Sequence, residues 1–154
     1  WIRVTMRLVF FPLLFALGAA LAAPRPGVAD SLVIPLRVNG HALRAEVAHT
    51  PETRNLGLMH RPSLPRNQGM LFVFREPDYH AMWMADTLIP LSVAFLDERG
   101  VILNIRDMKP LSEDIHPAVG LAKYALEMNA GWFRKRGIGP GARVEGLARA
   151  PRGE

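Results

Sequence analysis

Glycine and proline divide the chain after residue 30 into short apolar runs. The 154 residues include 13 glycines and 13 prolines. Proline lacks a backbone donor and glycine adds conformational freedom, so both residues interrupt regular structure. Short apolar runs bounded by such residues are typical of β-strands. We therefore predict strands over residues 31–38, 41–48, 69–74, 79–84, 91–97, 101–108, 123–128 and 142–147.

These runs predict a mainly β (α+β) domain, a compact antiparallel curved sheet or partial barrel with short helices covering its openings. Asn39-Gly40 lies between the first two runs. This pair is a strong hairpin signal, because a type I′ turn needs a positive φ at both central positions. Glu98-Arg99-Gly100 predicts a second tight turn. Thr50-Pro51-Glu52 provides an N-cap, a proline at the first helical position and an early acid, which predicts a short helix to about Met59.

Residues 1–29 have the pattern of a secretory signal peptide, with the true start of the protein expected at Met6. An arginine follows Met6, and an uncharged apolar run extends from Leu8 to Ala22. As a helix this run reaches only about 22 Å, short of a hydrocarbon core of about 30 Å. We therefore expect cleavage before Asp30 or Ala23 and no stable membrane span afterwards. An uncleaved anchor or a buried core helix is the alternative.

Export places the mature protein in the periplasm or outside the cell. We expect one domain over residues 30–148 and a flexible polar tail over residues 149–154. Removal of residues 1–29 leaves 16 basic and 14 acidic residues, a formal net charge of +2 in place of +5. That balance, without a basic run, predicts no nucleic-acid partner. The absence of cysteine excludes disulfides, thiolate nucleophiles and Cys-ligated zinc.

A series of short motifs runs along most of the mature chain. They are Thr50-Pro51-Glu52, Gly57-Leu58-Met59, Gly69-Met70-Leu71-Phe72, Trp83-Met84, Thr87, Ile89-Pro90-Leu91, Phe95, Asp97, Gly100 and Leu126-Glu127. Their order resembles the domain-of-unknown-function 192 family over about residues 33–147. The resemblance implies a compact, mainly β domain with short helices, often exported in bacteria, and no established activity. The family commonly carries Lys-Asn where this chain has Ala85-Asp86.

Catalytic patterns are missing from the sequence. None of the four serines lies in a Gly-x-Ser-x-Gly motif, and the five histidines show neither His-x-His nor His-Glu-x-x-His spacing. No glycine-rich loop of the phosphate-binding type joins a strand to a helix. We therefore expect no cofactor and no metal, and we favour a noncatalytic binding module for a small molecule, a glycan or an envelope protein.

The predicted binding site surrounds Trp83. A cation, carboxylates, a hydroxyl, a thioether and an indole together can orient a polar ligand. Alternation along residues 79–84 places apolar side chains on both strand faces, so Trp83 is also expected to be buried in the core. Asp86 is expected to stay at least partly accessible, because a buried unpaired carboxylate is costly. The predicted site residues are Met59, Arg61, Trp83, Asp86, Thr87 and Glu127.

The alternative function is a carboxylate-dependent hydrolase or lyase acting on an envelope substrate. Asp86, Asp97, Asp107 and Glu127 lie in or beside apolar strands, where burial raises a carboxyl pKa and suits general acid or base chemistry. The structural alternative is that Asp97 binds its own turn and that Glu127 pairs with a cross-strand basic residue. Two carboxylates about 5 to 10 Å apart in a cleft would favour the enzyme.

Expression from Met6 in a Gram-negative host should yield a periplasmic protein that begins at Asp30 or Ala23, since the leader is too short to span the membrane. Intact-mass analysis of the periplasmic fraction checks this. A membrane-bound species that retains Leu8 to Ala22 would contradict it.

Overall fold

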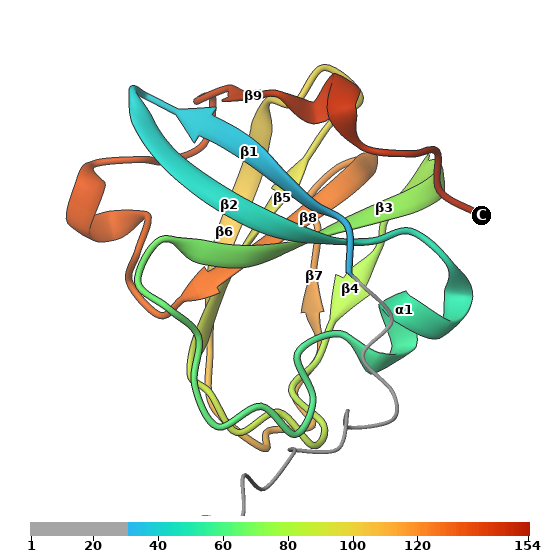
Figure 1. The fold of residues 1–154 in the computed structure, drawn as a ribbon, viewed down its shortest axis with the longest axis vertical. Helices are drawn as coiled ribbons and strands as arrows, with labels where there is room; N and C mark the ends of the chain where they lie inside the picture. Colours follow the sequence, from blue (N-terminus) through green and yellow to red (C-terminus); the bar gives the residue numbers. More distant parts are fainter. Residues whose placement is uncertain (1–30) are drawn as a thin grey trace, which may run out of the picture.

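A computed structural model describes residues 31–154, so the predicted signal peptide lies outside the described residues. A seven-stranded sheet curls into a half-barrel (Figure 1), in the order β6-β5-β8-β3-β2-β1-β9. A second, two-stranded sheet pairs β4 with β7. The predicted mainly β class is confirmed. The strands are β1 (Val33–Val38), β2 (His41–Ala48), β3 (Gln68–Asp78), β4 (Ala81–Met82), β5 (Leu91–Leu96), β6 (Ile102–Met108), β7 (His116–Pro117), β8 (Ala122–Asn129) and β9 (Val144–Glu145).

The helical elements are short. They are α1 (Pro51–Leu56) and two 3-10 turns, η1 (Arg134–Arg136) and η2 (Leu147–Arg149). The N-terminus of α1 lies where the sequence predicts it, because Thr50 accepts a hydrogen bond from the backbone N–H of Thr53. The helix ends before the predicted Met59, since Gly57 adopts φ +47°. Within residues 31–154, no helix has the length and apolar character needed to cross a membrane.

Local turn signals predict the hairpins correctly. Asn39 and Gly40 have φ values of 45° and 79°, and β1 and β2 pair antiparallel on either side of them. One strand pair departs from the expected antiparallel sheet, because β2 and β3 are parallel. Residues 49–67, which include α1, return the chain to the start of the neighbouring strand, as a parallel pair requires.

The two edges of the sheet meet at one end of the half-barrel. Val101 and Arg143 form an isolated antiparallel bridge. The N–H of Ile102 donates to the carbonyl of Ala142 at 2.8 Å, on the same side of the molecule. These bonds leave few free strand edges there, the arrangement expected of a partial barrel.

Two predicted strands are shorter than expected. Of residues 79–84 only Ala81–Met82 form a strand, and of residues 142–147 only Val144–Glu145 do. The first strand stops because residues 83–90 turn away from the sheet, with Asp86 at φ +51°. The second stops at Gly146, which adopts φ +98° at the start of η2.

The C-terminal residues pack against the domain. Polar composition alone favours a flexible tail over residues 149–154, yet the N–H of Glu154 donates to the carbonyl of His49 at 2.9 Å. Gly153 lies so close to Phe74 that an added Cβ would be 2.5 Å from its backbone. Tertiary contacts of this kind are not encoded in local sequence pattern.

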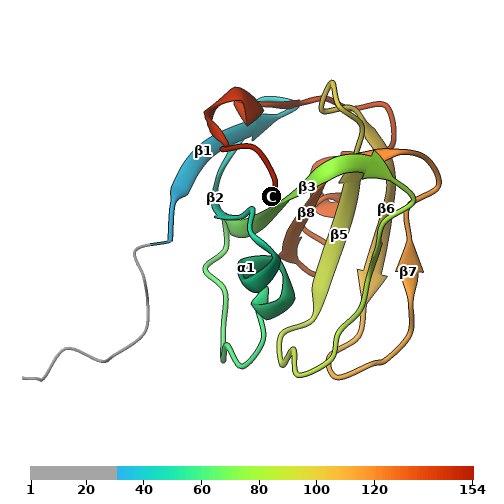
Figure 2. The same cartoon turned by 90° about the vertical axis from the view of Figure 1, so that its right-hand side faces the viewer.

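The central strands bury both faces. One face lines the inside of the half-barrel and packs against Trp132 and Phe133. The other face carries Phe72 and Phe95 and is covered by buried side chains from connecting segments, among them Leu58 and Met84. The connections and α1 gather at the end of the half-barrel opposite β9 (Figures 1 and 2).

Replacement of Gly69 by alanine should lower the free energy of unfolding by about 1 to 3 kcal/mol, because the new methyl group overpacks a filled site. Its Cβ would lie 2.3 Å from the backbone oxygen of Glu127. Gly139→Ala is the matched control, since nothing lies within 4 Å of that position. Urea denaturation midpoints measure both, and equal midpoints would contradict the packing argument.

Candidate functional site

Four of the six predicted site residues meet at one small cavity. Met59, Trp83, Thr87 and Glu127 line a cavity with a volume of about 40 Å³, which we call the Glu127 pocket. Met59 comes from the segment after α1, Trp83 and Thr87 come from the segment after β4, and Glu127 comes from the central strand β8. Arg61 and Asp86 are not among the residues that line it.

Glu127 is a buried carboxyl without a protein partner. Its relative exposure is 3%, and no hydrogen bond or ion pair to its carboxyl is formed by residues 31–154. The prediction that Glu127 pairs with a cross-strand basic residue is wrong, because Met70 and Val93 occupy the neighbouring positions on β3 and β5. Burial raises the pKa of Glu127 to about 8, so the carboxyl is mostly protonated at neutral pH.

Trp83 is exposed rather than buried, so the prediction of a core side chain is wrong. Its relative exposure is 52%, whereas Met84 beside it is fully buried. The strand ends at Met82, and the N–H of Met84 then donates to the carbonyl of Ser112 at 3.1 Å. The alternation assumed for residues 79–84 therefore stops before Trp83, which leaves the indole on the surface.

A larger groove adjoins the Glu127 pocket. It has a volume of about 580 Å³, and we call it the Trp83 groove. Its apolar wall includes Phe74, on which the ring of His80 stacks with ring centroids 3.7 Å apart. The two cavities share the lining residues Arg54, Asn55, Phe72, Met82 and Trp83. A ligand in the groove can therefore extend a small group toward Glu127.

Thr87 and Asp86 lie in the turn that carries Trp83. Thr87 is buried, and its hydroxyl donates to the carbonyl of Ala85 at 3.0 Å, which leaves the oxygen able to accept from a ligand. Asp86 is exposed, in line with the expected accessibility. Its φ of +51° is a conformation that aspartate and asparagine tolerate better than most residues. We interpret Asp86 as a turn residue, because its carbonyl accepts from the N–H of His60 at 2.9 Å.

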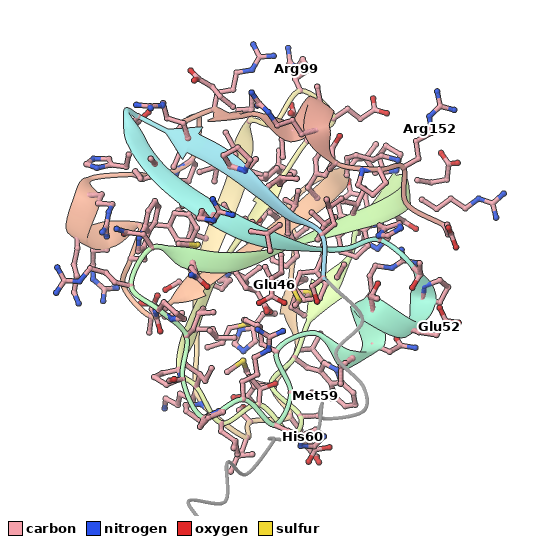
Figure 3. The ribbon with its side chains drawn as sticks, in the orientation of Figure 1. Glu46, Glu52, Met59, His60, Arg99 and Arg152 are labelled. Atoms are coloured by element: carbon pink, nitrogen blue, oxygen red, sulfur yellow. The ribbon has the colours of Figure 1, made fainter. Side chains whose placement is uncertain are left out.

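Arg61 forms a bidentate ion pair with Glu46. Its two terminal nitrogens donate to the carboxylate oxygens at 2.5 and 2.6 Å. The hydrogen bonds to Glu46 raise the pKa of Arg61, although burial opposes this. Figure 3 shows Glu46 on the side of β2 that faces the segment carrying Met59 and His60. The ion pair therefore occupies the guanidinium that the sequence analysis placed in the predicted binding site.

The remaining acids that suggested catalysis have structural partners. Burial raises the pKa of Asp97, but hydrogen bonds from the backbone of Val101 and Arg99, both at 2.9 Å, and from the side chain of Arg99 together lower it. Asp107 accepts from the hydroxyl of Ser92 and from Arg134, and both bonds lower its pKa. Of the described residues that line the Glu127 pocket, Glu127 is the single carboxylate. The adjoining Trp83 groove is lined by two more acidic residues, Glu76 and Asp78.

Sequence reasoning did not predict Arg54, Asn55 and Phe72 as site residues. Arg54 shows why. Its guanidinium donates to the carbonyls of His49 at 2.6 Å, Val73 at 3.0 Å and Glu154 at 2.6 Å. Val73 and Glu154 are 19 and 100 residues away in the chain, so no local pattern predicts these two bonds. Within residues 31–154, no three His, Cys, Asp or Glu side chains are grouped to hold a metal ion.

The fold and the site define a class of small β half-barrel domains with a buried carboxyl beneath an exposed tryptophan. The chain belongs to the domain-of-unknown-function 192 family (DUF192), described as "Uncharacterized ACR", whose family model matches residues 34–146. This confirms the resemblance inferred from the order of the motifs. No curated protein matches the chain.

Two solved structures resemble this domain. One is a protein from Sinorhizobium meliloti 1021 described as a "putative transcription regulator", which is 35% identical with a TM-score of 0.75 and aligns over 79% of this chain and 98% of that one. The other is a protein of unknown function from Novosphingobium aromaticivorans DSM 12444. It is 36% identical with a TM-score of 0.74, over 82% of this chain and 94% of that one.

The free energy of unfolding should fall as the pH rises from about 4.5 to about 8, and Glu127→Gln should remove this component. Below pH 4.5 the carboxyl is protonated in both states. Between pH 4.5 and pH 8 the unfolded chain releases the proton of Glu127 while the folded protein retains it. The free energy of unfolding therefore falls by about 1.4 kcal/mol for each pH unit in this range. Urea titrations of both proteins across this range measure the difference. A constant difference would show that Glu127 titrates normally.

Proposed function

We propose that this protein is an exported, noncatalytic module that binds an uncharged sugar or a similar small molecule bearing hydroxyl groups. The observation that carries the proposal is the buried, partnerless Glu127 in a small pocket that adjoins a groove with an exposed indole. Export rests on the apolar run from Leu8 to Ala22 and its flanks. Binding rests on the chemistry of the site.

The protonated state of the Glu127 carboxyl favours an uncharged ligand group. A protonated carboxyl both donates and accepts a hydrogen bond, which matches a hydroxyl. Its pKa of about 8 keeps it in that form at neutral pH. The carboxyl of Glu127 makes no hydrogen bond within the described residues, so a ligand hydroxyl that bonds to it adds an interaction worth about 0.5 to 1.5 kcal/mol that the protein alone lacks. The volume of about 40 Å³ suits a single hydroxyl or hydroxymethyl group.

The Trp83 groove suits the body of such a ligand. A half-exposed indole offers a flat apolar face with a polar N–H, and Met82 and Phe72 continue that apolar surface. A volume of about 580 Å³ lies within the range of about 300 to 1,000 Å³ typical of small-molecule sites. A ring placed on Trp83 can direct one hydroxyl into the Glu127 pocket. The hydroxyl of Thr87 offers that group an acceptor.

Methyl β-glucoside should shift the indole N–H signal of Trp83 in a ¹H–¹⁵N NMR titration and leave that of Trp132 unchanged. Trp132 is an internal control, because it is buried and its indole N–H donates to Asn67 at 3.1 Å. The affinity for the glucoside should be constant well below pH 8. Above pH 8 it should fall by up to about tenfold per pH unit, because ionisation of the Glu127 carboxyl removes its hydrogen-bond donor.

Two variants separate binding from folding. Glu127→Gln should bind the glucoside without this pH dependence, since the amide still donates and accepts. Trp83→Ala should lose binding while its urea midpoint stays close to that of the wild type, because the indole is half exposed. Methyl glucosaminide carries an amino group in place of one hydroxyl. If it binds more tightly than the glucoside as the pH rises, the proposal of an uncharged ligand is contradicted. No shift of Trp83 with either sugar would contradict a sugar site.

A further inference from the structure

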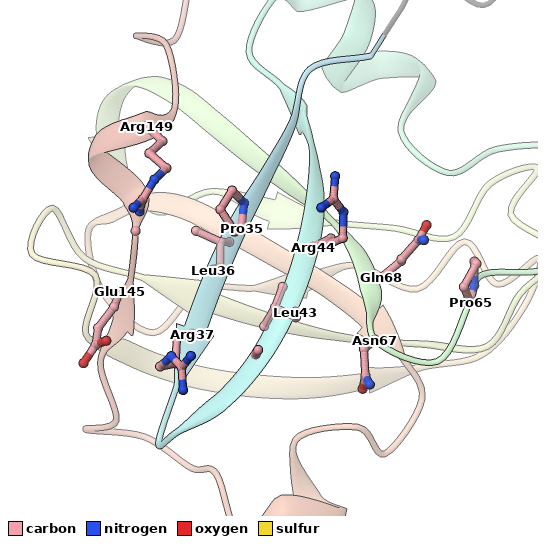
Figure 4. Close-up of a pocket in the computed structure, with 12 residues that line it drawn as sticks. Pro35, Leu36, Arg37, Leu43, Arg44, Pro65, Asn67, Gln68, Glu145 and Arg149 are labelled. Atoms are coloured by element: carbon pink, nitrogen blue, oxygen red, sulfur yellow. The ribbon is translucent and has the colours of Figure 1, made fainter.

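A second groove lies on the outer face of the β1–β2 hairpin, and it has a different chemistry from the Trp83 groove (Figure 4). Its volume is about 570 Å³. We call it the arginine groove, because Arg37 from β1, Arg44 from β2 and Arg149 from η2 line it. None of its lining residues belongs to the Glu127 pocket or the Trp83 groove.

The strand register brings two of these arginines together. Arg37 is opposite Ala42, and Pro35 is opposite Arg44, so all four side chains share the outer face of the hairpin. Arg37 and Arg44 are therefore diagonal neighbours, with a typical separation of roughly 7 to 8 Å between their Cα atoms. Both side chains are exposed.

The cations of the groove have no carboxylate partner. None of the ion pairs within residues 31–154 involves Arg37, Arg44 or Arg149. The groove has one acidic lining residue, Glu145, which is opposite Arg37 in the β1–β9 pairing and makes no ion pair with it. The side chain of Arg37 instead donates to the carbonyl of Gly40 at 3.1 Å. Three arginines against one carboxylate leave the groove with an excess of positive charge, which favours an anionic partner.

The positive surface extends beyond this groove. The segment Leu64–Gln68 contributes side chains to the arginine groove and also to a neighbouring groove of about 740 Å³. This neighbouring groove is lined by Arg66, Lys135 and Arg136, and none of its lining residues is acidic. Two adjacent grooves of one sign suit an extended ligand with several negative charges better than a single small anion.

The floor of the arginine groove identifies the class of ligand. Pro35 and Ala42 supply apolar surface beside the cations, and Pro65 lines the groove beyond Gln68 (Figure 4). Guanidinium groups pair with carboxylates in a two-pronged geometry, while the apolar floor accepts aliphatic side chains. Single-stranded nucleic acids are typically held by exposed aromatic side chains, and this groove has none among its lining residues. We infer that the arginine groove binds an acidic peptide segment of a partner protein.

The test uses a fluorescein-labelled peptide of repeated Glu-Glu-Leu and fluorescence anisotropy. The protein should bind it, and binding should weaken between about 50 and about 200 mM salt, as expected for charge pairing. A repeated Gln-Gln-Leu peptide, which lacks the charges, should bind at least about fivefold more weakly. A repeated Glu-Glu-Ser peptide should also bind more weakly, since it lacks the aliphatic contacts.

The variant Arg44→Glu, Arg149→Glu should reduce affinity for the acidic peptide at least about fivefold. Both side chains are exposed, so its thermal unfolding should match that of the wild type. The matched control is Arg106→Glu, Lys109→Glu, which makes the same change in net charge at two exposed cations outside the groove and should retain binding. An equal loss in the control would show a bulk charge effect and overturn the assignment. Tighter binding of a thymidine oligonucleotide, lost in the same double variant, would also overturn it.

Discussion

The central strands of this sheet are apolar on both faces, and the rest of the structure follows from the need to cover them. Every residue of β5 is buried, and so are residues 69–74 of β3. Curling into a half-barrel covers one face, and the connecting segments cover the other. Burial of apolar area contributes roughly 25 cal/mol per Å². Leaving either face exposed would therefore cost more free energy than the net stability of a small domain.

The same covering layer creates the candidate site. Residues that follow α1 and β4 are drawn over β8, which places Met59 and Thr87 above Glu127. Alternation along β8 puts Glu127 on the face that Ala125 also occupies, between the buried apolar residues Met70 and Val93 of the neighbouring strands. A carboxyl at such a position opposes the stability of the fold. Departures of this kind from local rules are expected at functional sites, which is why the proposed ligand is placed there.

Two glutamates of the same sheet differ in how their charge is compensated. Glu46 is opposite Met70, and Met70 is opposite Glu127, so the two glutamates are two strands apart, roughly 10 Å between Cα atoms. Arg61 neutralises Glu46 with two hydrogen bonds, whereas Glu127 has no cation and is kept neutral by burial. The arginine groove presents the opposite case, with three arginines that form no ion pair. The two proposed sites therefore differ in the chemistry that each one leaves unsatisfied.

The sequence by itself determined the features that depend on neighbouring residues. The turn at Asn39-Gly40 and the start of α1 after Thr50 follow from backbone preferences and from contacts three residues apart, which any chain with these residues would make. Most strand positions follow from apolar runs that have to be buried. The motif order sufficed to indicate the family and four of the residues that line the Glu127 pocket.

Only the tertiary structure decided how those residues are used. Trp83 is exposed because its strand ends one residue earlier, at Met82, where the chain turns to bond Ser112. Arg61 is withdrawn from the pocket because Glu46, 15 residues earlier in the chain, lies within reach of its guanidinium. Glu127 lacks a partner because the strands on either side place apolar residues opposite it. Each outcome depends on which distant segment becomes a neighbour, and that is set by the packing of the whole chain rather than by local sequence.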